Sequence, residues 1–424
     1  MKLRCALTTC ILLIFTVLNS YAQDFNGNGS KWIKGWTNFT PNVTNYPEAD
    51  EKLPNIIVED TYLSNDTVYL LSGDVYVTSN AILTIQEGTI IRGDHENPAN
   101  LIIARGSKLI AVGSEAYPIV FTSNKAPKSR ASGDWGGIII AGSGKVNSVS
   151  GNGVIKGNFN PQYSVYGGSN QDEQTAVLRY VRIEFPGNKS KRIENSNGLS
   201  LFGIGTASII DHIMVSYSGQ DSFNWTGGNN NMRNMLSYKA EDDDFQICEG
   251  FKGDLDYLMA IRHPYINSPK GSYAIEIDGY NKSSGYLKPN AITDVTITNS
   301  TFVNLSNNSN YIHTSSAISA TNSALVYLHN SKISGFLNVV KFDDSYTSLA
   351  VLERAFKMDN SFFNIHGEGV EVSYKPNNGV MNVLKYNRFT KDFVSVDKLF
   401  EDPTSKIAPK FQLKKAMNNY MVMQ

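Results

Sequence analysis

The sequence predicts an all-β protein, a single right-handed parallel β-helix (a solenoid) with a cap at each end. From about Ile56 onward, the chain consists of short runs of Val, Ile, Leu, Phe and Tyr separated by Gly, Asn, Asp and Ser. Such runs are typical of strands broken by turns. Similar segments recur at intervals of about 20 to 30 residues, which indicates stacked coils. Hairpin signals are few, so a β-sandwich is the less favoured alternative.

The first residues have the features of an export signal. Lys2 and Arg4 precede an apolar run that extends to about Leu18, and small residues follow at a typical cleavage position. This run is too short for a membrane span. We therefore expect residues 1–22 to be a cleaved signal peptide and the mature chain to begin at Gln23. The mature protein is expected in the periplasm, at the outer membrane or outside the cell.

The mature chain divides into three predicted parts. Residues 23–55 are polar and are expected to form a leader and N-terminal cap, in which Trp32 and Trp36 pack onto the first coil. Residues 56–405 are expected to form the β-helix. Residues 406–424 are expected to cover its final coil as a C-terminal cap. A solenoid needs such caps because each end otherwise exposes an open sheet edge.

Spacings between similar segments suggest the register of the coils. Gly88 and Gly106 lie 18 residues apart within two similar strand–turn–strand segments. Ile213, Met235 and Leu258 occupy the centres of three similar segments, separated by 22 and 23 residues. We expect these three apolar residues to stack in successive coils.

Asparagine recurs late in the chain with a longer spacing. Asn299, Asn330 and Asn360 each precede a serine and lie 31 and 30 residues apart. Asparagine tolerates the left-handed backbone conformation, and its side chain can bond to a stacked copy of itself. We therefore expect these residues at equivalent turns of successive coils.

Composition excludes several classes of function. The chain has 38 basic and 39 acidic residues, and removal of the two basic residues of the signal peptide leaves a net charge of about −3. No nucleic-acid partner is expected from this balance, and no later stretch is long and apolar enough for a transmembrane helix. Cys248 is the only cysteine left in the mature chain, so it forms no internal disulfide and is interpreted as a small buried hydrophobe. We expect a monomer.

Four segments, taken together and in order, resemble a family of secreted or outer-membrane-associated parallel β-helix proteins of Gram-negative bacteria. The segments are residues 132–138, 180–185, 216–225 and 242–253. Some members of that family carry a multidrug transporter label, but this chain lacks the membrane spans that a transporter needs. The family pattern has acids where this chain has Gln220 and Asn224, so the resemblance does not carry over carboxylate chemistry at these positions.

An acidic cluster is the main candidate site. If the coils repeat every 22 residues, Asp221 lies beside the triplet Asp242, Asp243 and Asp244. Oxygen-rich clusters suit Ca²⁺, and the predicted metal ligands are Asp221, Asp242 and Asp244. The alternative is that these residues are solvated turn residues.

Two tryptophans are candidate sugar-binding residues. Trp135 and Trp225 lie next to glycine pairs, which would leave their rings uncovered. Exposed rings near Asp and Asn could stack on a sugar and bind its hydroxyls, together with Asp221, Asp242, Asp243 and Asp244. The alternative is that both rings pack at the corners of coils.

The sequence favours an exported, non-enzymatic protein that binds a glycan or a cell-envelope partner such as an outer-membrane receptor. The alternative is a polysaccharide-active lyase or hydrolase that uses the acidic loops. Binding is favoured because the Gly-His-Gly and Arg-Ile-Lys motifs of β-helical pectinases are absent. No catalytic residue is assigned.

Overall fold

The computed structural model describes residues 30–188, 196–266, 268, 271–283, 285–286, 292–305, 316–374 and 380–414. The expected signal peptide lies outside these residues. Within them, no helix has the length and apolar character needed to cross a membrane.

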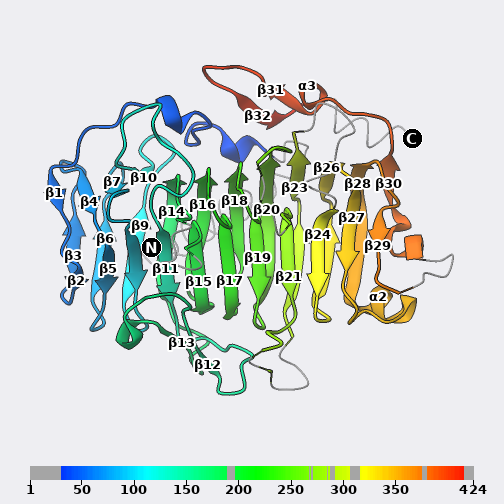
Figure 1. Cartoon of the computed structure of the whole chain (residues 1–424), viewed down its shortest axis with the longest axis horizontal. Coiled ribbons are helices and arrows are strands. Elements are labelled where there is room, and N and C mark those ends of the chain that lie inside the picture. The colour runs from blue at the N-terminus through cyan, green and yellow to red at the C-terminus, as the bar shows by residue number, and fades with distance from the viewer. Residues whose placement is uncertain are drawn as a thin grey trace, which may run out of the picture.

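Parallel strands stack into two large sheets that run the length of the molecule (Figure 1). The 17-stranded sheet, sheet A, contains β1 (Glu51–Lys52), β3 (Thr61–Leu63), β4 (Tyr69–Leu71), β6 (Ile82–Ile85), β7 (Ile90–Gly93), β9 (Lys108–Val112), β10 (Ile119–Ser123), β14 (Ala176–Glu184), β16 (Ile209–Ser216), β18 (Met232–Tyr238), β20 (Lys252–Arg262), β22 (Asp294–Thr298), β23 (Thr301–Asn304), β25 (Leu325–His329), β26 (Lys332–Phe336), β28 (Phe356–Ile365) and β30 (Tyr386–Thr390). The 11-stranded sheet, sheet B, contains β2 (Ile56–Ile57), β5 (Asp74–Val77), β8 (Asn100–Ile103), β11 (Gly137–Ala141), β15 (Leu199–Ile204), β17 (Phe223–Gly228), β19 (Phe245–Cys248), β21 (Ile275–Asp278), β24 (Ser316–Thr321), β27 (Asn338–Phe342) and β29 (Val370–Glu371). The predicted parallel β-helix is confirmed.

From β14 to β28, sheet A bends where one residue per coil adopts a left-handed conformation. The predicted asparagines lie at this bend, with φ of 52° at Asn299, 48° at Asn330 and 47° at Asn360. Asn330 Nδ2 donates to Asn299 Oδ1 over 2.7 Å. The expected stacking of asparagines at equivalent turns is therefore confirmed for this pair, and all three have the expected backbone.

The inward faces of both sheets form one continuous apolar core. Ile213 pairs in register with Met235, which pairs with Leu258, as their spacing predicts. The glycine spacing is misleading, because Gly88 lies between β6 and β7 whereas Gly106 lies between β8 and β9.

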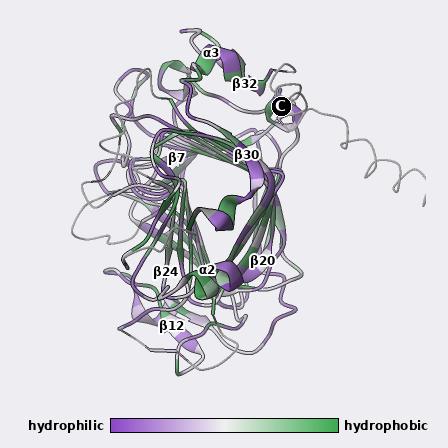
Figure 2. Cartoon of the chain, turned by 90° about the vertical axis from the view of Figure 1, so that its right-hand side faces the viewer, coloured by the Kyte–Doolittle hydropathy of each residue, from purple (hydrophilic) through white to green (hydrophobic). Residues whose placement is uncertain are grey.

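The C-terminal end of the core is covered by short helices (Figure 2). The helix α2 (Leu349–Ala355) begins at Ser348, whose hydroxyl accepts a hydrogen bond from the Val351 amide. Its residues Leu352 and Ala355 are buried in the main core. The 3-10 helix η5 (Val380–Leu384) contacts α2 and β28 and adds further buried residues to the same core.

The N-terminal segment, residues 30–50, lies along the outer face of sheet A instead of covering the first coil. It contains the 3-10 helices η2 (Lys31–Ile33) and η3 (Pro41–Val43). The expectation that Trp32 and Trp36 pack on the first coil is wrong, because both rings meet His212 on β16, with centroid distances of 6.0 and 5.8 Å.

The C-terminal segment meets the N-terminal one on sheet A. Helix α3 (Val396–Leu399) leads into an antiparallel hairpin of β31 (Phe400–Asp402) and β32 (Lys410–Leu413). The Phe411 ring lies 4.8 Å from Phe39 and 5.5 Å from Tyr238. The two ends of the described chain therefore pack on the same outer face of sheet A, at the top of Figure 1.

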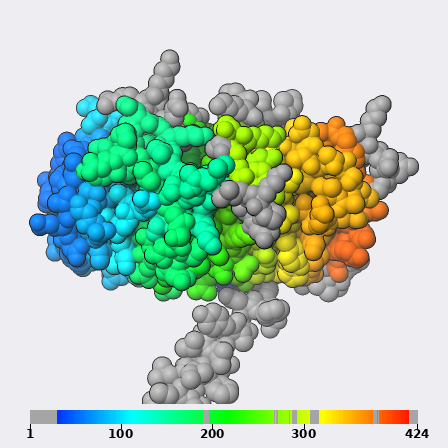
Figure 3. All heavy atoms as spheres, turned by 90° about the horizontal axis from the view of Figure 1, so that it is seen from below, coloured from blue at the N-terminus to red at the C-terminus, as the bar shows by residue number. Residues whose placement is uncertain are grey.

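A long insertion between β11 and β14, residues 142–175, forms an arm on the opposite side. It contains the antiparallel pair β12 (Asn152–Val154) and β13 (Val165–Gly167) and the 3-10 helix η4 (Pro161–Tyr163). The arm lies at the bottom of Figure 1 and faces the reader in Figure 3.

Candidate functional site

The outer face of sheet B presents a row of polar side chains in its middle coils. Strand side chains alternate between the two faces of a sheet. In β17, Phe223 and Trp225 therefore point into the core, while Asn224 and Thr226 point outward. In β21, Ile275 and Ile277 lie in the core, and the acids between and after them point outward.

Register connects these outward residues across the strands. Asn224 pairs with Gln246, and Gln246 pairs with Glu276. Asn224 Nδ2 donates to Gln246 Oε1, and Gln246 Nε2 donates to Glu276 Oε2 over 3.2 Å. Thr226 Oγ1 donates to Asn224 Oδ1 over 2.6 Å. We call Asn224, Thr226, Gln246 and Glu276 the polar ladder.

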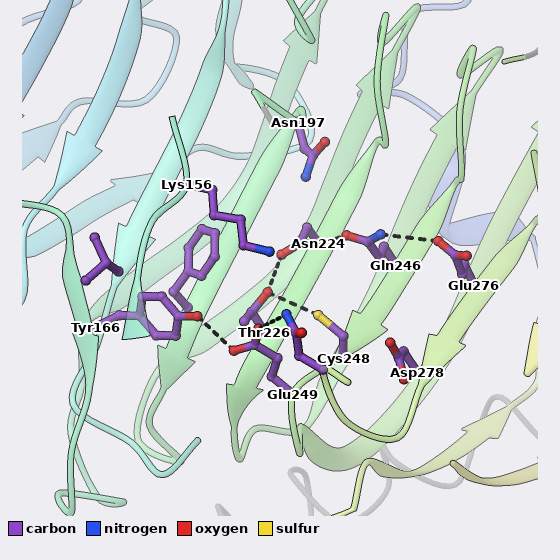
Figure 4. Close-up of a pocket in the computed structure, with 13 residues that line it drawn as sticks. Lys156, Tyr166, Asn197, Asn224, Thr226, Gln246, Cys248, Glu249, Glu276 and Asp278 are labelled. Atoms are coloured by element: carbon purple, nitrogen blue, oxygen red, sulfur yellow. Dashed lines mark hydrogen bonds between the residues drawn. The ribbon is translucent and has the colours of Figure 1, made fainter. Parts of the chain in front are cut away.

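The arm covers part of this face and encloses a pocket of about 260 Å³ (Figure 4). It is fastened to sheet B because Tyr166 donates to Glu249 Oε2 over 2.8 Å and Asn147 Nδ2 donates to the Gly279 carbonyl over 2.9 Å. Figure 4 shows Lys156 reaching from the arm towards Asn224. The lining residues are Val154, Lys156, Tyr166, Asn197, Phe202, Asn224, Thr226, Gln246, Cys248, Glu249, Glu276, Asp278 and Asn281.

Burial sets the protonation of several lining groups. It raises the pKa of Tyr166, and the negative charge of Glu249 raises it further. Burial also raises the pKa of the Cys248 thiol, which is therefore neutral. The pKa of Asp278 is raised by burial, although Asn322 Nδ2 donates to its Oδ1 over 2.6 Å. The pocket thus offers neutral hydroxyl, thiol and amide groups beside carboxyl groups.

The predicted acidic cluster forms next to this pocket, at the turns before β17 and β19. Carboxylate oxygens of Asp221, Asp242 and Asp243 all lie within 4.8 Å of one another. The Asp243 amide donates to Asp221 Oδ1 over 3.2 Å, and the Tyr273 amide donates to Asp243 Oδ1 over 2.6 Å. The 22-residue spacing therefore correctly predicted that Asp221 lies beside Asp242 and Asp243.

The pKa values of the cluster depend on burial, on the charges within the cluster and on Glu276 of the polar ladder. Burial raises the pKa of Asp221 well above its usual value, and the charge of Asp242 is the next largest cause. Burial likewise raises the pKa of Asp243, followed by the charge of Glu276. These acids lie too close to be ionised together without a neutralising cation.

Asp244 does not belong to the cluster, so its predicted role as a metal ligand is contradicted. Its Oδ2 accepts a hydrogen bond from Arg262 Nη1 over 2.6 Å, and Ser237 donates to its Oδ1. The side chains of Asp244 and Arg262 are 0% and 1% exposed. Asp243, which occupies the position equivalent to Asp221 one coil later, takes its place in the cluster.

The cluster fits Ca²⁺ by ligand chemistry. Calcium binds oxygen ligands at roughly 2.3–2.6 Å, so two ligands of one ion lie up to about 5 Å apart. The separations among Asp221, Asp242 and Asp243 fall within this limit. Arg262, whose positive charge opposes the raised pKa of Asp221, is already engaged by Asp244 and by the carbonyls of Asp242 and Tyr273.

Neither predicted tryptophan presents a free face. Trp135 and Trp225 are both 0% exposed. Trp225 shares the inward face of β17 with Phe223 and stacks on Phe245 at 5.6 Å. Trp135 donates its Nε1 proton to the Glu184 carbonyl over 2.8 Å. The adjacent glycines therefore do not uncover these rings, because strand alternation and core contacts decide their exposure.

The sequence did not predict Lys156, Tyr166, Glu276 and Asp278 as site residues. They come from the arm and from β21, and only the fold brings them together. A usable signal existed in the alternation Ile-Glu-Ile-Asp at 275–278, which predicts two acids on one outward face.

Comparison with known proteins gives a family match across most of the chain. The family described as the pectate-lyase-like beta helix domain matches residues 55–399. No curated protein matches the sequence.

Three solved structures are similar at low identity. The crystal structure of pectate lyase Pel9A has 11% identity and a TM-score of 0.39, covering 84% of this chain and 90% of that chain. The Agl-KA catalytic domain has 17% identity and a TM-score of 0.29, with coverage of 68% and 53%. The catalytic unit of a GH87 alpha-1,3-glucanase from Streptomyces thermodiastaticus strain HF3-3 has 12% identity and a TM-score of 0.29, with coverage of 77% and 62%.

Proposed function

Since the chain belongs to the pectate-lyase-like beta helix family, we propose that it is an exported protein that binds a polysaccharide in the pocket between the arm and sheet B. The observation that carries this proposal is the polar ladder, which continues from Asn224 through Gln246 to Glu276 along the pocket floor. The signal peptide expected at residues 1–22 supports export.

The chemistry of the pocket favours a saccharide over an anionic ligand. Amide, hydroxyl and carboxyl groups can both donate to and accept from sugar hydroxyls. Neighbouring strands lie about 4.8 Å apart, so the ladder offers such groups at regular intervals. The lining contains three carboxyl groups, on Glu249, Glu276 and Asp278, against the single ammonium group of Lys156. This acidic lining disfavours phosphates and nucleic acid.

We further propose that Ca²⁺ binds Asp221, Asp242 and Asp243. The cation would neutralise the cluster, in which burial and neighbouring negative charges raise the pKa of Asp221 and Asp243. It would also lower the negative potential beside Glu276, which borders both the cluster and the pocket.

A second candidate function is cleavage of the bound glycan. Glu276 and Asp278 point outward from β21 two residues apart, so both carboxyl groups lie on the strand face that lines the pocket. Glycosidases use two carboxyl groups that flank the scissile bond, and one of them is kept protonated as the general acid. Burial raises the pKa of Asp278, which suits the proton donor. The ladder supports binding whether or not cleavage follows.

The test uses the mature protein from Gln23 with a panel of soluble plant, algal and bacterial polysaccharides, with and without Ca²⁺. Affinity electrophoresis measures binding, and assays for new reducing ends and unsaturated products measure cleavage. Glu276→Gln should weaken binding, whereas the control Glu87→Gln, at an exposed turn far from the pocket, should not.

Binding without products would support a binding protein, and products lost in Asp278→Asn would establish the enzyme. Equal binding by Glu276→Gln and Glu87→Gln would exclude this pocket as the glycan site.

A further inference from the structure

A second, larger cavity of about 740 Å³ lies on sheet A, on the side of the molecule opposite the arm. Its walls are residues 30–40 of the N-terminal segment, the bend of β14 and β16, and the C-terminal hairpin. We call it the terminal cleft. Its volume lies within the roughly 300–1,000 Å³ typical of small-molecule sites.

Aromatic rings line one part of the terminal cleft. Tyr180 and His212 stack with a centroid distance of 4.4 Å and an interplanar angle of 24°. Trp32 meets His212 edge-on at 6.0 Å and 80°. Trp36 is buried beneath them and donates its Nε1 proton to the Trp32 carbonyl over 2.6 Å. Trp32, Tyr180 and His212 are only partly buried, so they form an accessible aromatic corner.

Tyr180 and His212 adopt a backbone conformation that is energetically unfavourable for bulky residues. Tyr180 and His212 occupy the left-handed bend of sheet A, with φ of 50° and 56°. Asparagine holds the equivalent position at Asn234 and in the three later coils described above, and Tyr257 holds it in one further coil. Asparagine tolerates this conformation better than a bulky residue does. The strained positions of Tyr180 and His212 differ from that of Tyr257 because their two rings lie stacked side by side at the cleft.

Orientation of the imidazole is fixed by its neighbours. His212 Nδ1 lies 2.7 Å from Asp211 Oδ1, and Asn234 Nδ2 donates to the same oxygen over 2.9 Å. Such fixed rings are suited to stacking because little rotamer entropy is lost on binding.

Polar groups at the cleft match a neutral ligand. Among the described residues, Gln412 Oε1 is buried without a hydrogen-bond partner, and it lines the cleft. A buried acceptor without a partner is costly, so a donor from a ligand would relieve it. The charged lining residues nearly balance, with Lys31, Lys34 and Lys410 against Glu115 and Glu401. This balance disfavours a strongly charged ligand.

We propose that the terminal cleft is a second glycan-binding site, which takes one or two neutral sugar rings against Trp32, Tyr180 and His212. Apolar sugar faces stack on the rings, and a sugar hydroxyl donates to Gln412. This site is separate from the pocket on sheet B and does not require it.

The test measures binding of cellohexaose, mannohexaose and xylohexaose to the full mature chain by calorimetry and saturation-transfer NMR. Tyr180→Asn and His212→Asn remove the rings but install the residue that other coils carry at this bend. The matched control is Tyr257→Asn, the same substitution at the same left-handed position outside the cleft. Trp32→Ala is an additional variant at a partly exposed site.

We expect at least one hexasaccharide to bind, and each cleft variant to weaken binding at the cleft by roughly tenfold, while Tyr257→Asn leaves it unchanged. Glu276→Gln is measured separately because it reports any binding of the same sugar to the sheet B pocket. Thermal melting checks that each variant is folded. If no hexasaccharide binds, or if Tyr180→Asn, His212→Asn and Trp32→Ala bind as tightly as Tyr257→Asn, the terminal cleft is not a glycan site. Binding lost only in Glu276→Gln would assign the ligand to the sheet B pocket instead.

Discussion

Asp244 and Arg262 form a charge pair that is almost fully shielded from water. The Arg262 guanidinium also donates to the carbonyls of Tyr273 and Asp242, at 2.9 Å each. These bonds fix the turn before β19, on which the acidic cluster depends. The pair therefore positions the candidate site without belonging to it.

Arg262→Met should lower the free energy of unfolding by about 3–5 kcal/mol, because the Asp244 carboxylate then stays buried without its partner. Urea unfolding measures the change. The control is Arg179→Met, whose side chain is 45% exposed and lies 3.9 Å from Asp211; exposed pairs contribute about 0–1 kcal/mol. Similar losses in the two variants would show that the buried pair has no special importance.

Glu184 is a second buried acid, and it gives stability a definite pH dependence. Burial raises its pKa above the ordinary value of 4.5, while Arg182 is the largest opposing influence. Tyr46 donates to its Oε1 over 2.9 Å. A carboxyl group with a raised folded-state pKa binds its proton more tightly when folded. Its stabilising contribution is thus complete below the unfolded pKa and is lost as the pH rises through the folded pKa.

Glu184→Gln should therefore flatten the decline in stability above about pH 4.5, because the amide stays neutral. Urea unfolding at several pH values from about 4 to 8 gives the comparison, and the difference from wild type removes contributions shared with other acids. The exposed control Glu87→Gln should keep the wild-type slope. A slope unchanged by Glu184→Gln would mean that this carboxyl group is not the source.

Contacts between residues that lie one repeat apart could be predicted from the sequence. Asp221 and Asp243 are one coil apart, so spacing alone placed them together. The exposure predicted for Trp225 was wrong. The neighbouring glycines do not determine its exposure, whereas its position on the same strand face as the apolar Phe223 indicates burial. Glu276 could not be assigned to the same site, because the coil before it is longer than 22 residues and the sequence does not reveal where the extra residues lie.

Among the elements, the left-handed bend of sheet A has the clearest sequence signal. Asparagine favours the left-handed backbone of the bend and can bond to a stacked asparagine, so the positions of Asn299 and Asn330 could be predicted. The register between coils was harder to predict, because the structure pairs Leu83 with Leu109 and does not pair Gly88 with Gly106. Loop lengths vary between coils, and similar turns can therefore recur at positions that are not equivalent.

Asn330→Ala should destabilise the protein by about 1–2 kcal/mol, because alanine is strained at positive φ and loses the bond to Asn299. Asn330→Gly removes the same bond without the strain, so its cost should be smaller. Thermal and urea unfolding of both variants separates the two effects. An equal cost in the two variants would indicate that the hydrogen bond alone matters.

The arm depends on Tyr166 for its attachment to sheet B. Tyr166→Phe removes the hydroxyl that donates to Glu249 and should cost about 1 kcal/mol. We expect faster limited proteolysis at the exposed turn near residues 149–151, because the arm separates from the sheet more often. Tyr163→Phe is the control within the same arm, where the ring packs on Tyr76 at 5.2 Å. Equal cleavage rates would exclude the hydroxyl as the fastening contact.

Over the whole molecule, the two described ends of the chain meet on sheet A and the arm covers part of sheet B. The β-helix itself was predictable because its signals repeat in every coil. The path of residues 30–50 was not, because nothing in a single polar segment states which coil it will contact. Phe39 reaches Tyr238 and Phe411, residues about 200 and 370 positions away. Such long-range partners define the terminal cleft and lie beyond any spacing argument.

Calcium should stabilise the whole fold, because ions that bind only the folded state shift the unfolding equilibrium. At a hundredfold excess over its Kd, the gain is about 2.7 kcal/mol. Thermal unfolding with Ca²⁺ and with a chelator measures it. Asp242→Asn removes one partly exposed member of the cluster and should abolish most of the shift, whereas Asp254→Asn, at an exposed position of β20, should keep it. Ca²⁺ would link the turns before β17 and β19, so successive coils should unfold together more cooperatively when it is bound. If wild type and Asp242→Asn respond equally, Asp221, Asp242 and Asp243 are not the ligands, and their shared protons provide the neutralisation instead.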